Sequence, residues 1–229
     1  MKKATTILAT ILAILTEFLI FLSLTSCTEN KLTNPAVEVE SVKIGSQVWM
    51  KTNLNVDHYR NGDVIPQVTD PVEWSKLTTG AWCYYNNDPA MGAIYGKIYN
   101  WYAITDPRGF LEEGWQVPSE ADWTKLAVFL AGEHVAGGKL KESGTAHWNY
   151  PNLNATNVTG FSALPGGYRS LSGDFGGNGS TADFWSYSVD NSIRAWDMYM
   201  HNDHESLIKD SISKCDGFSV RLVRNSFIK

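Results

Sequence analysis

The N-terminal segment constrains this chain most, because it decides in which compartment the rest must fold. Lys2 and Lys3 begin it, an apolar run starts at Ala4, and the run closes on the tetrapeptide LTSC, which ends at Cys27. A basic start, an apolar middle and small residues before the cleavage point are typical of a secretory signal. The tetrapeptide resembles a bacterial lipobox. The sequence therefore predicts a signal peptide over residues 1–26 and lipidation of Cys27.

An uncleaved transmembrane helix is the alternative for this segment, because about 20 apolar residues can cross a bilayer. Glu17 interrupts the run, and a carboxylate inside a spanning helix costs about 3 kcal/mol on insertion scales. That cost favours the lipoprotein. In both interpretations the folded part is tethered to a membrane outside the cytoplasm. Thr28, rather than aspartate, follows Cys27, which favours the outer membrane, on its periplasmic or surface face.

About 200 residues follow the lipobox, enough for one domain with a sizeable core. Residues 27–36 are polar and include Pro35, so we expect a flexible spacer there and a single domain over residues 37–229. Loss of residues 1–26 changes the net charge from −5 to −6. This mildly acidic balance argues against nucleic acid as a partner. The 19 glycines and 12% aromatic residues suit a loop-rich extracellular domain that contains strands.

Cysteine usage agrees with an oxidising compartment. Lipidation of Cys27 leaves Cys83 and Cys215 as an even pair. We expect a disulfide between them, and in the chain-entropy model closing so long a loop contributes about 4–5 kcal/mol. The alternative is two free thiols that pack as small apolar residues.

Periodicity predicts one clear helix, a weaker one and several short strands. A capping box formed by Ser119 and Asp122 starts a helix that runs to about Ala131, with Gly132 as its C-cap. A shorter helix is expected over residues 134–142, weakened by two glycines. Alternating patterns predict a hairpin over residues 37–54 and strands over residues 80–85, 193–201, 206–213 and 217–224. The aromatic segment 95–104 fits a strand and a helix equally well.

Five motifs in a fixed order carry a family resemblance. They are YGKIYNWYA at 95–103, GWQVPSEADW at 114–123, ATNVTGFSALPGGYR at 155–169, FWS at 184–186 and GFSVR at 217–221. In this order they resemble the Fibrobacter succinogenes major paralogous domain, over roughly residues 42–224. That family is similar to the group that holds C-type lectin-like domains and the formylglycine-generating, sulfatase-modifying enzymes.

The resemblance implies an α+β fold. It would consist of a C-type-lectin-like twisted antiparallel sheet with one main helix, long irregular loops, and N- and C-terminal strands that pair. It also implies a secreted or lipid-anchored bacterial protein, and the family brings no established biochemical activity with it.

Motifs that carry known chemistry are missing from the sequence. A formylglycine-generating enzyme needs a reactive cysteine pair and an Asn-Val-Trp-Glu-Trp-like motif, and FWS at 184–186 stands in that place without the acidic residue. The Glu-Pro-Asn, Gln-Pro-Asp and Trp-Asn-Asp motifs of metal-dependent lectins are absent. So are Gly-x-Ser-x-Gly, phosphate-loop and zinc-protease motifs. We therefore expect no catalytic residue and no enzymatic activity.

Metal ligands are few in this sequence. Asp174, Asn178 and Asp183 stand among glycines and offer the oxygen atoms that calcium prefers. Their spacing matches no known calcium loop, so a solvated loop without a cofactor is the favoured interpretation. His201 and His204 lie three residues apart beside acidic residues and can ligate a transition metal, although a plain hairpin loop is expected there.

Aromatic side chains remain as candidates for a binding site, because their faces stack on sugar rings, whereas packing in the core is the alternative for each. The candidates are Trp148, Tyr150, Tyr168, Phe175 and Trp185. We expect the first two to be exposed, since polar and glycine residues surround them.

The sequence thus favours a cell-envelope lipoprotein with a non-catalytic, lectin-like binding or adhesion domain. Its membrane contact would be the lipid anchor, and its ligand a glycan or a surface protein. The alternatives are an enzyme of the sulfatase-modifying type or another envelope hydrolase, and a structural surface scaffold.

Overall fold

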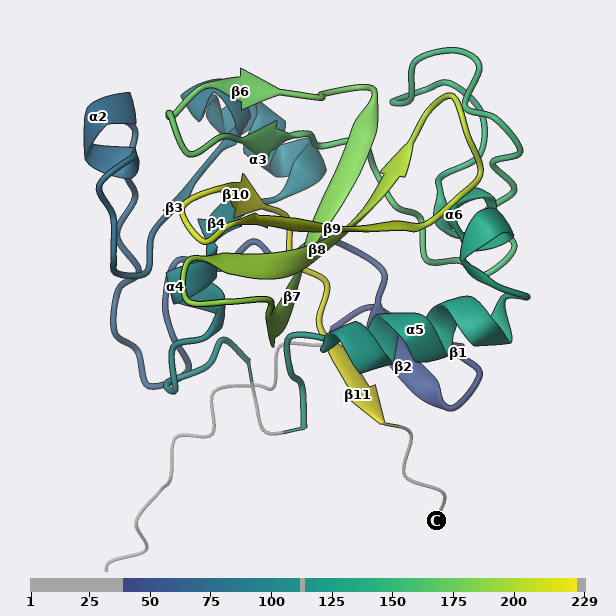
Figure 1. Cartoon of the computed structure of the whole chain (residues 1–229), viewed down its shortest axis with the longest axis horizontal. Helices are drawn as coiled ribbons and strands as arrows, with labels where there is room; N and C mark the ends of the chain where they lie inside the picture. The colour runs from purple at the N-terminus through teal and green to yellow at the C-terminus, as the bar shows by residue number, and fades with distance from the viewer. Residues whose placement is uncertain (1–38, 112–113, 226–229) are drawn as a thin grey trace, which may run out of the picture. The chain divides into compact units, whose positions relative to one another are not determined.

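The computed structural model describes residues 39–111 and 114–225, which form an α+β domain of helices and antiparallel sheets (Figure 1). The α+β class expected from the sequence, with its antiparallel sheets, is confirmed. Cys27, the signal segment and the spacer lie outside the described residues. Within the described part of the chain, none of the helices is both long and apolar enough to cross a bilayer.

The strands form three sheets, each antiparallel throughout. The first has the order β1-β2-β11, with strands Ser41–Ile44, Gln47–Met50 and Val223–Asn225. The second has the order β3-β4-β10-β5-β6, with strands Trp82–Cys83, Ile98–Asn100, Gly217–Phe218, Tyr168–Arg169 and Phe175–Gly176. The third has the order β7-β8-β9, with strands Thr181–Val189, Arg194–His201 and Ile208–Ser213.

Short helices lie between the strands. They are α2 (Pro71–Trp74), the 3-10 helix η1 (Tyr85–Asn87), α3 (Pro89–Tyr95), α4 (Trp101–Ile104), α5 (Glu120–Phe129) and α6 (Glu133–Leu140). Helix α5 is the longest of them, but α3 and α6 have seven and eight residues. The expected single main helix is therefore one of several.

The first sheet joins the two ends of the domain, as the family resemblance implies. The β1–β2 hairpin turns at Gly45, whose φ of 61° favours glycine. Strand β11 pairs with the other edge of β2, with Val223 opposite Trp49. The predicted hairpin and the predicted pairing of terminal strands are both confirmed.

Helix α5 begins as its capping box predicts and ends at Phe129, two residues before the predicted end at Ala131. The Ser119 Oγ accepts a hydrogen bond from the Asp122 N–H at 3.1 Å, and the Asp122 carboxylate accepts one from the Ser119 N–H at 2.9 Å. At the other end Ala131 adopts φ 75°, the left-handed position that we predicted for Gly132. Gly132 is instead the N-cap of α6, which is a correction to the sequence prediction.

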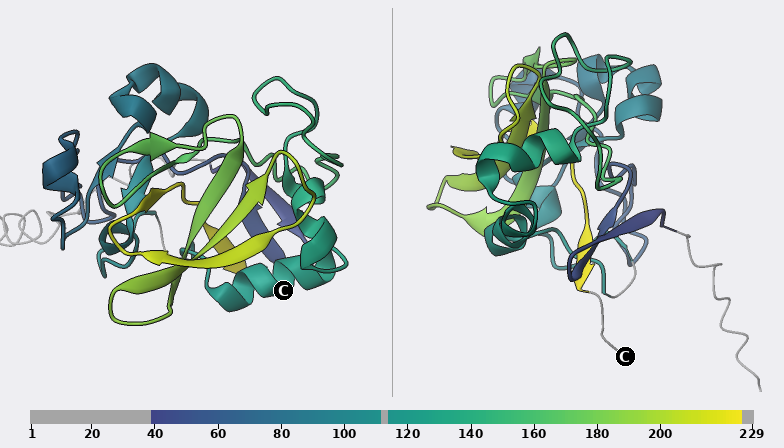
Figure 2. Two further views of the ribbon diagram at one scale, coloured as in Figure 1. Left: turned by 45° about the horizontal axis from the view of Figure 1, so that its top comes forward. Right: turned by 90° about the vertical axis from the view of Figure 1, so that its right-hand side faces the viewer.

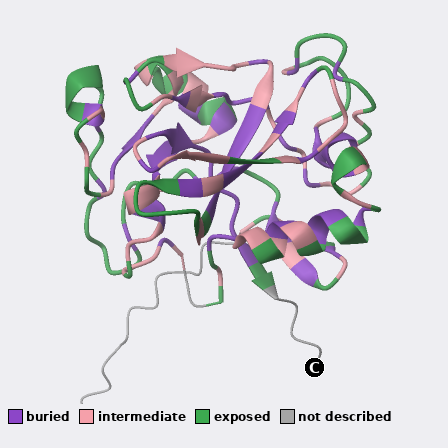
Figure 3. Ribbon diagram, viewed as in Figure 1, coloured by how far each residue is buried: buried purple, intermediate pink, exposed green. Residues whose placement is uncertain are grey.

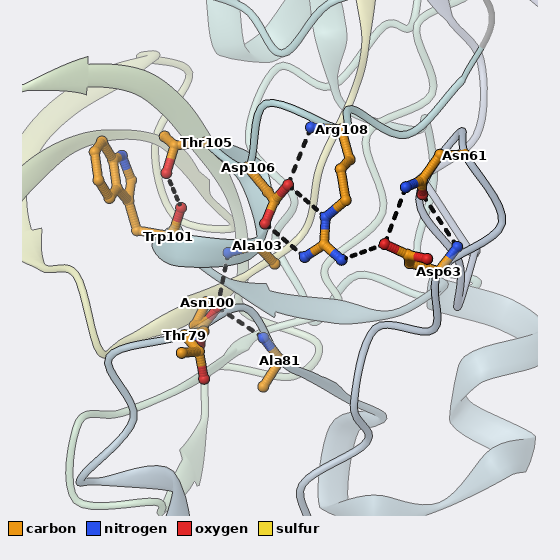
Figure 4. A network of polar contacts seen from close by, with 10 residues as sticks. All are labelled: Asn61, Asp63, Thr79, Ala81, Asn100, Trp101, Ala103, Thr105, Asp106 and Arg108. Carbon is orange, nitrogen blue, oxygen red and sulfur yellow. Dashed lines mark hydrogen bonds and ion pairs between the residues drawn. The ribbon is translucent and has the colours of Figure 1, made fainter.

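Segment 95–104 was ambiguous because it contains both a strand and a helix. The side chain of Asn100 joins them: its Oδ1 accepts hydrogen bonds from the N–H groups of Ala81 and Ala103, both at 3.0 Å. Its Nδ2 donates to the Thr79 carbonyl at 2.8 Å. Figure 4 shows this arrangement at the point where β4 passes into α4. One buried side chain thus ends the strand and caps the helix.

The β7-β8-β9 sheet divides the core into two parts. On one face Phe184 and Met198 pack with residues of α5 and α6 in the cluster around Trp123. On the other face Trp185 and Ala195 belong to a second cluster, which includes residues of β4 and β10. Figures 1 and 2 show α5 and α6 over one side of this sheet. Figure 3 shows that the crossing region of β7 and β8 is buried.

The two cysteines of the folded part are free in this structure, so the predicted disulfide is wrong here. Cys83 is fully buried in the cluster around Trp74, and burial raises the pKa of its thiol to about 12. The Cys215 Sγ lies 3.6 Å from the Leu77 carbonyl oxygen instead. The alternative of two packed thiols describes Cys83 well, while Cys215 remains partly exposed.

Candidate functional site

A pocket of about 380 Å³ lies between the β7-β8-β9 sheet and strands β5 and β10. It combines carboxylates with aromatic and aliphatic side chains, and its volume falls in the usual range for small-molecule sites. The lining residues are Tyr168, Ser170, Leu171, Thr181, Asp183, Asp197, Tyr199, Asp210, Ile212, Asp216 and Phe218. We call it the acidic pocket.

The strand register brings three of its carboxylates together. Asp197 in the middle of β8 stands opposite Asp210 of β9, and Asp183 of β7 stands opposite Tyr199, two residues further along β8. Side chains two residues apart on a strand share one face, and opposite residues have Cβ atoms about 5 Å apart. A fourth carboxyl group of the pocket lining, Asp216, lies in the turn before β10. Two ionised carboxylates opposed in this way would destabilise a sheet, so the arrangement favours protonation of one of them.

Several of these carboxyl groups are also buried, which is unusual for aspartate side chains. Asp197 is 3% exposed, and its Oδ1 is buried without a hydrogen-bond partner among the described residues. Asp183 is 7% exposed and accepts a hydrogen bond from the Thr181 hydroxyl at 2.6 Å. Buried polar atoms are nearly always hydrogen-bonded, and an unpaired one costs about 1–3 kcal/mol. Asp197 itself belongs to the lining of the pocket, although this oxygen is covered.

The same burial shifts the pKa values of these carboxyl groups upward. Desolvation raises the pKa of Asp197 to about 8, and the neighbouring charge of Asp183 adds to the effect. Desolvation also raises the pKa of Asp183 and that of Asp216 to about 6 each. These shifts favour the protonated form of Asp197 near neutral pH, and a protonated carboxyl group can donate a hydrogen bond. Carboxyls with shifted pKa values in a cleft mark functional sites more often than other places.

Aromatic rings form the apolar part of the acidic pocket. The Phe218 ring packs on Trp185 with centroids 4.7 Å apart, and Tyr168 meets Phe218 edge-on at 6.3 Å. Trp185 is fully buried, and its indole N–H donates to the Tyr99 carbonyl at 2.7 Å. Trp185 therefore supports the ring layer of the pocket and does not itself offer a face to a ligand.

The other aromatic candidates lie elsewhere. Trp148 is 1% exposed and its indole N–H donates to the Ala163 carbonyl at 3.0 Å, so its expected exposure is wrong. It packs in the core cluster around Trp123 instead. Tyr150 is 86% exposed, as expected. Phe175 packs edge-on against Tyr85 with centroids 5.4 Å apart. Of the five candidates only Tyr168 lines the acidic pocket.

The three calcium candidates have separate partners. Asp174 accepts a hydrogen bond from the Ser172 hydroxyl at 2.7 Å, and Asn178 donates to the Pro165 carbonyl at 3.2 Å. Asp183 alone lines the acidic pocket. The sequence missed its three companions, Asp197, Asp210 and Asp216. The sequence did contain one signal for this pocket. The alternating pattern predicts Asp197 on the same strand face as Ala195, and a carboxylate on a face that packs against the core is unusual.

A second pocket, of about 480 Å³, lies around Arg108 but has its charges paired. Arg108 contacts Asp106 at 2.7 Å and Asp63 at 2.8 Å, and its guanidinium lies 4.0 Å from the Tyr59 ring centroid. Figure 4 shows the guanidinium between the two carboxylates. Because its charges already have partners, this pocket is a weaker candidate than the acidic one.

Comparison with known proteins places these features in a family. The model of the Fibrobacter succinogenes major domain matches residues 42–224, which include all five sequence motifs and every residue of the acidic pocket. The chain belongs to this family. Neither the curated proteins nor the solved structures gave a match. The function of this Fibrobacter succinogenes major domain must therefore be argued from its own residues.

Two arginines of the family motifs have structural roles. Arg221, in GFSVR, is 1% exposed and donates to Asn53 Oδ1 at 2.6 Å and to the Met50 and Ser162 carbonyls at 3.1 and 3.0 Å. Arg169, at the end of LPGGYR, donates to the Val68 carbonyl at 2.7 Å. These motifs thus hold distant loops together and place Tyr168 and Phe218 beside the pocket.

Proposed function

We propose that this chain is a cell-envelope lipoprotein whose domain binds a glycan in the acidic pocket without catalysing a reaction. The observation that carries the proposal is one pocket in which several carboxyl groups lie beside aromatic residues. The C-type-lectin-like arrangement belongs to the same proposal, and the α+β architecture with paired terminal strands supports it. A protein ligand that inserts a polar side chain is the alternative occupant.

The pocket chemistry suits sugar hydroxyl groups. Carboxylate groups accept hydrogen bonds from hydroxyls, and charge-assisted bonds of this kind are stronger than neutral ones; Asp210 lines the pocket in a position to do so. The protonated Asp197 can donate to a ring or hydroxyl oxygen. The partly exposed ring of Tyr168, supported by the buried Phe218, can offer apolar contact to the C–H side of a sugar ring.

A glycan array probed with the full chain in detergent tests the binding function. We expect selective binding of one glycan class, and about tenfold weaker binding by Asp210→Asn, since a hydrogen bond to a charged group contributes about 1.5–3 kcal/mol. Asp174→Asn is the matched control, because Asp174 is exposed and does not line the pocket. An array without binding, or equal losses in the two variants, would contradict the proposal.

The lipid anchor is tested separately. Metabolic labelling with a fatty acid should mark the chain and leave Cys27→Ala unlabelled, and the variant should leave the membrane fraction. Labelling of the variant to the same extent would exclude Cys27 as the lipidation site.

An envelope hydrolase is the second candidate, favoured by the separated pKa values of Asp197 and Asp183. A protonated carboxyl beside an ionised one is the pair used in glycoside hydrolysis. Release of products from the bound glycan, abolished in Asp197→Asn, would favour this candidate over simple binding. The sulfatase-modifying type is disfavoured, because neither Cys83 nor Cys215 lines the pocket. A structural scaffold is the function that remains if no ligand binds.

A further inference from the structure

The turn between β8 and β9 brings two imidazole rings and a carboxylate together outside the acidic pocket. The His201 Nδ1 lies 2.6 Å from the Asp203 Oδ1, and the His204 Nε2 lies 3.8 Å from the same oxygen. The two rings stack, with centroids 5.5 Å apart and an angle of 19° between their planes. One ligand atom from each of the three residues falls within 4.8 Å of the others, and no other described group of His, Cys, Asp or Glu does so.

We propose that His201, Asp203 and His204 bind a single zinc ion. Zinc takes imidazole nitrogen and carboxylate oxygen at about 2.0–2.2 Å, so the ligand atoms of a tetrahedral site lie about 3.4 Å apart. The separations of 2.6 and 3.8 Å lie on either side of that value, and small side-chain rotations equalise them. Three protein ligands leave the fourth position to water or to another molecule.

The backbone of the turn is held in place from inside the domain. The buried Lys141 Nζ donates to the carbonyl oxygens of His201 and His204, both at 2.9 Å, and to that of Leu153 at 3.1 Å. The side chains of His201, Asp203 and His204 stay 32%, 62% and 35% exposed, so an ion can reach them. A fixed backbone with accessible side chains is the preorganised state that a metal site needs.

The surroundings of the His204 ring leave its Nε2 as the nitrogen nearest to the cluster. The Nδ1 is buried without a hydrogen-bond partner among the described residues, whereas the Nε2 lies 3.8 Å from the Asp203 Oδ1.

The charges that face the cluster also favour a cation. Asp203 belongs to it, Asp183 is close enough to interact with His201, and Glu205 is the next residue along the turn. The ammonium group of Lys141 opposes them with a single positive charge. A surplus of negative charge therefore remains near the ligand atoms.

Zinc titration of the full chain, stripped of metal and kept in detergent, tests the site. Calorimetry should show one zinc ion per chain, and cobalt should give the absorption spectrum of a tetrahedral site. His204→Gln and Asp203→Asn should each weaken zinc binding by at least about tenfold. The matched control is His58→Gln, because His58 makes the same 2.6 Å contact with Asp57 in a pair that is not part of a three-ligand group.

Either of two results would overturn the site: absence of zinc binding by the natural chain, or equal zinc affinity of His204→Gln and the natural chain. Asp203 is exposed and its substitution preserves the fold, so Asp203→Asn keeps the test valid if a histidine variant unfolds. None of the three ligands lines the acidic pocket, and the zinc result is therefore independent of the glycan result.

Discussion

Arg221, a charged residue of the GFSVR motif, makes its hydrogen bonds in the interior of this domain. Its guanidinium is buried, its hydrogen bonds end on Asn53, Met50, Phe161 and Ser162, and it lies 4.5 Å from the Phe161 ring centroid. A planar guanidinium presents five donors in fixed directions, whereas an ammonium group is a point charge with three. The arginine is therefore matched to this set of acceptors.

Arg221→Lys should destabilise the domain by about 3 kcal/mol, because a lysine leaves several of these acceptors buried and unpaired. Arg194→Lys is the control, since Arg194 is exposed on β8 and should change the free energy of unfolding by less than about 0.5 kcal/mol. Urea denaturation of the two variants measures the difference. Equal stabilities would show that the buried contacts of Arg221 contribute little.

At the scale of elements, the position of helix α6 depends on close contact between its own backbone and neighbouring backbone segments. A Cβ atom on Gly137 would lie 2.3 Å from the Ser206 carbonyl oxygen, and one on Gly138 would lie 2.6 Å from the Asn154 carbonyl oxygen. The Gly138 N–H donates to the Glu205 carbonyl at 2.8 Å. These glycines lower the helix propensity of α6. Because they have no side chains, however, they allow α6 to pack directly against the β8–β9 turn.

Gly137→Ala should therefore destabilise the domain by about 2 kcal/mol, although alanine has the higher helix propensity by about 1 kcal/mol. Val128→Ala in α5 is the comparison, because Val128 is 71% exposed and the change should be within about 0.5 kcal/mol of neutral. Thermal unfolding followed by circular dichroism distinguishes the two. Stabilisation by Gly137→Ala would mean that α6 does not pack as closely as described.

Local signals predicted the elements well and the site poorly. The Ser119 and Asp122 capping box located α5, because both partners lie within one helical turn. The acidic pocket depends instead on the register that sets Asp197 opposite Asp210, which a single sequence does not reveal. Trp148 was misplaced for the same reason, since its burial depends on loops that are remote in sequence.

For the whole molecule, the raised pKa values of the pocket carboxyls predict how stability depends on pH. A carboxyl whose pKa is higher in the folded state binds more protons there, so its stabilising contribution is present at low pH and is lost as the pH rises through the folded pKa. For Asp183 and Asp216 the loss develops between the ordinary pKa of 3.8 and the folded pKa of about 6, and for Asp197 it continues up to the folded pKa of about 8. Carboxyls with lowered pKa values, such as Asp106, act in the other direction at a lower pH.

The free energy of unfolding without ligand should therefore fall between about pH 5 and about pH 8.5. In Asp197→Asn the fall should shrink by at least about 1 kcal/mol, because the amide carries no charge at either pH. Urea titrations at the two pH values measure both quantities. A variant with the same pH dependence as the natural chain would mean that Asp197 is not held protonated in the folded state.

A ligand in the acidic pocket should compensate the cost of the opposed carboxylates, and the structure of the chain with its best array glycan tests this most directly. We predict a sugar whose hydroxyl groups lie within hydrogen-bond distance of Asp197 and Asp210, with one ring face against Tyr168. A glycan bound at any other surface, or no glycan bound at all, would contradict the proposed function.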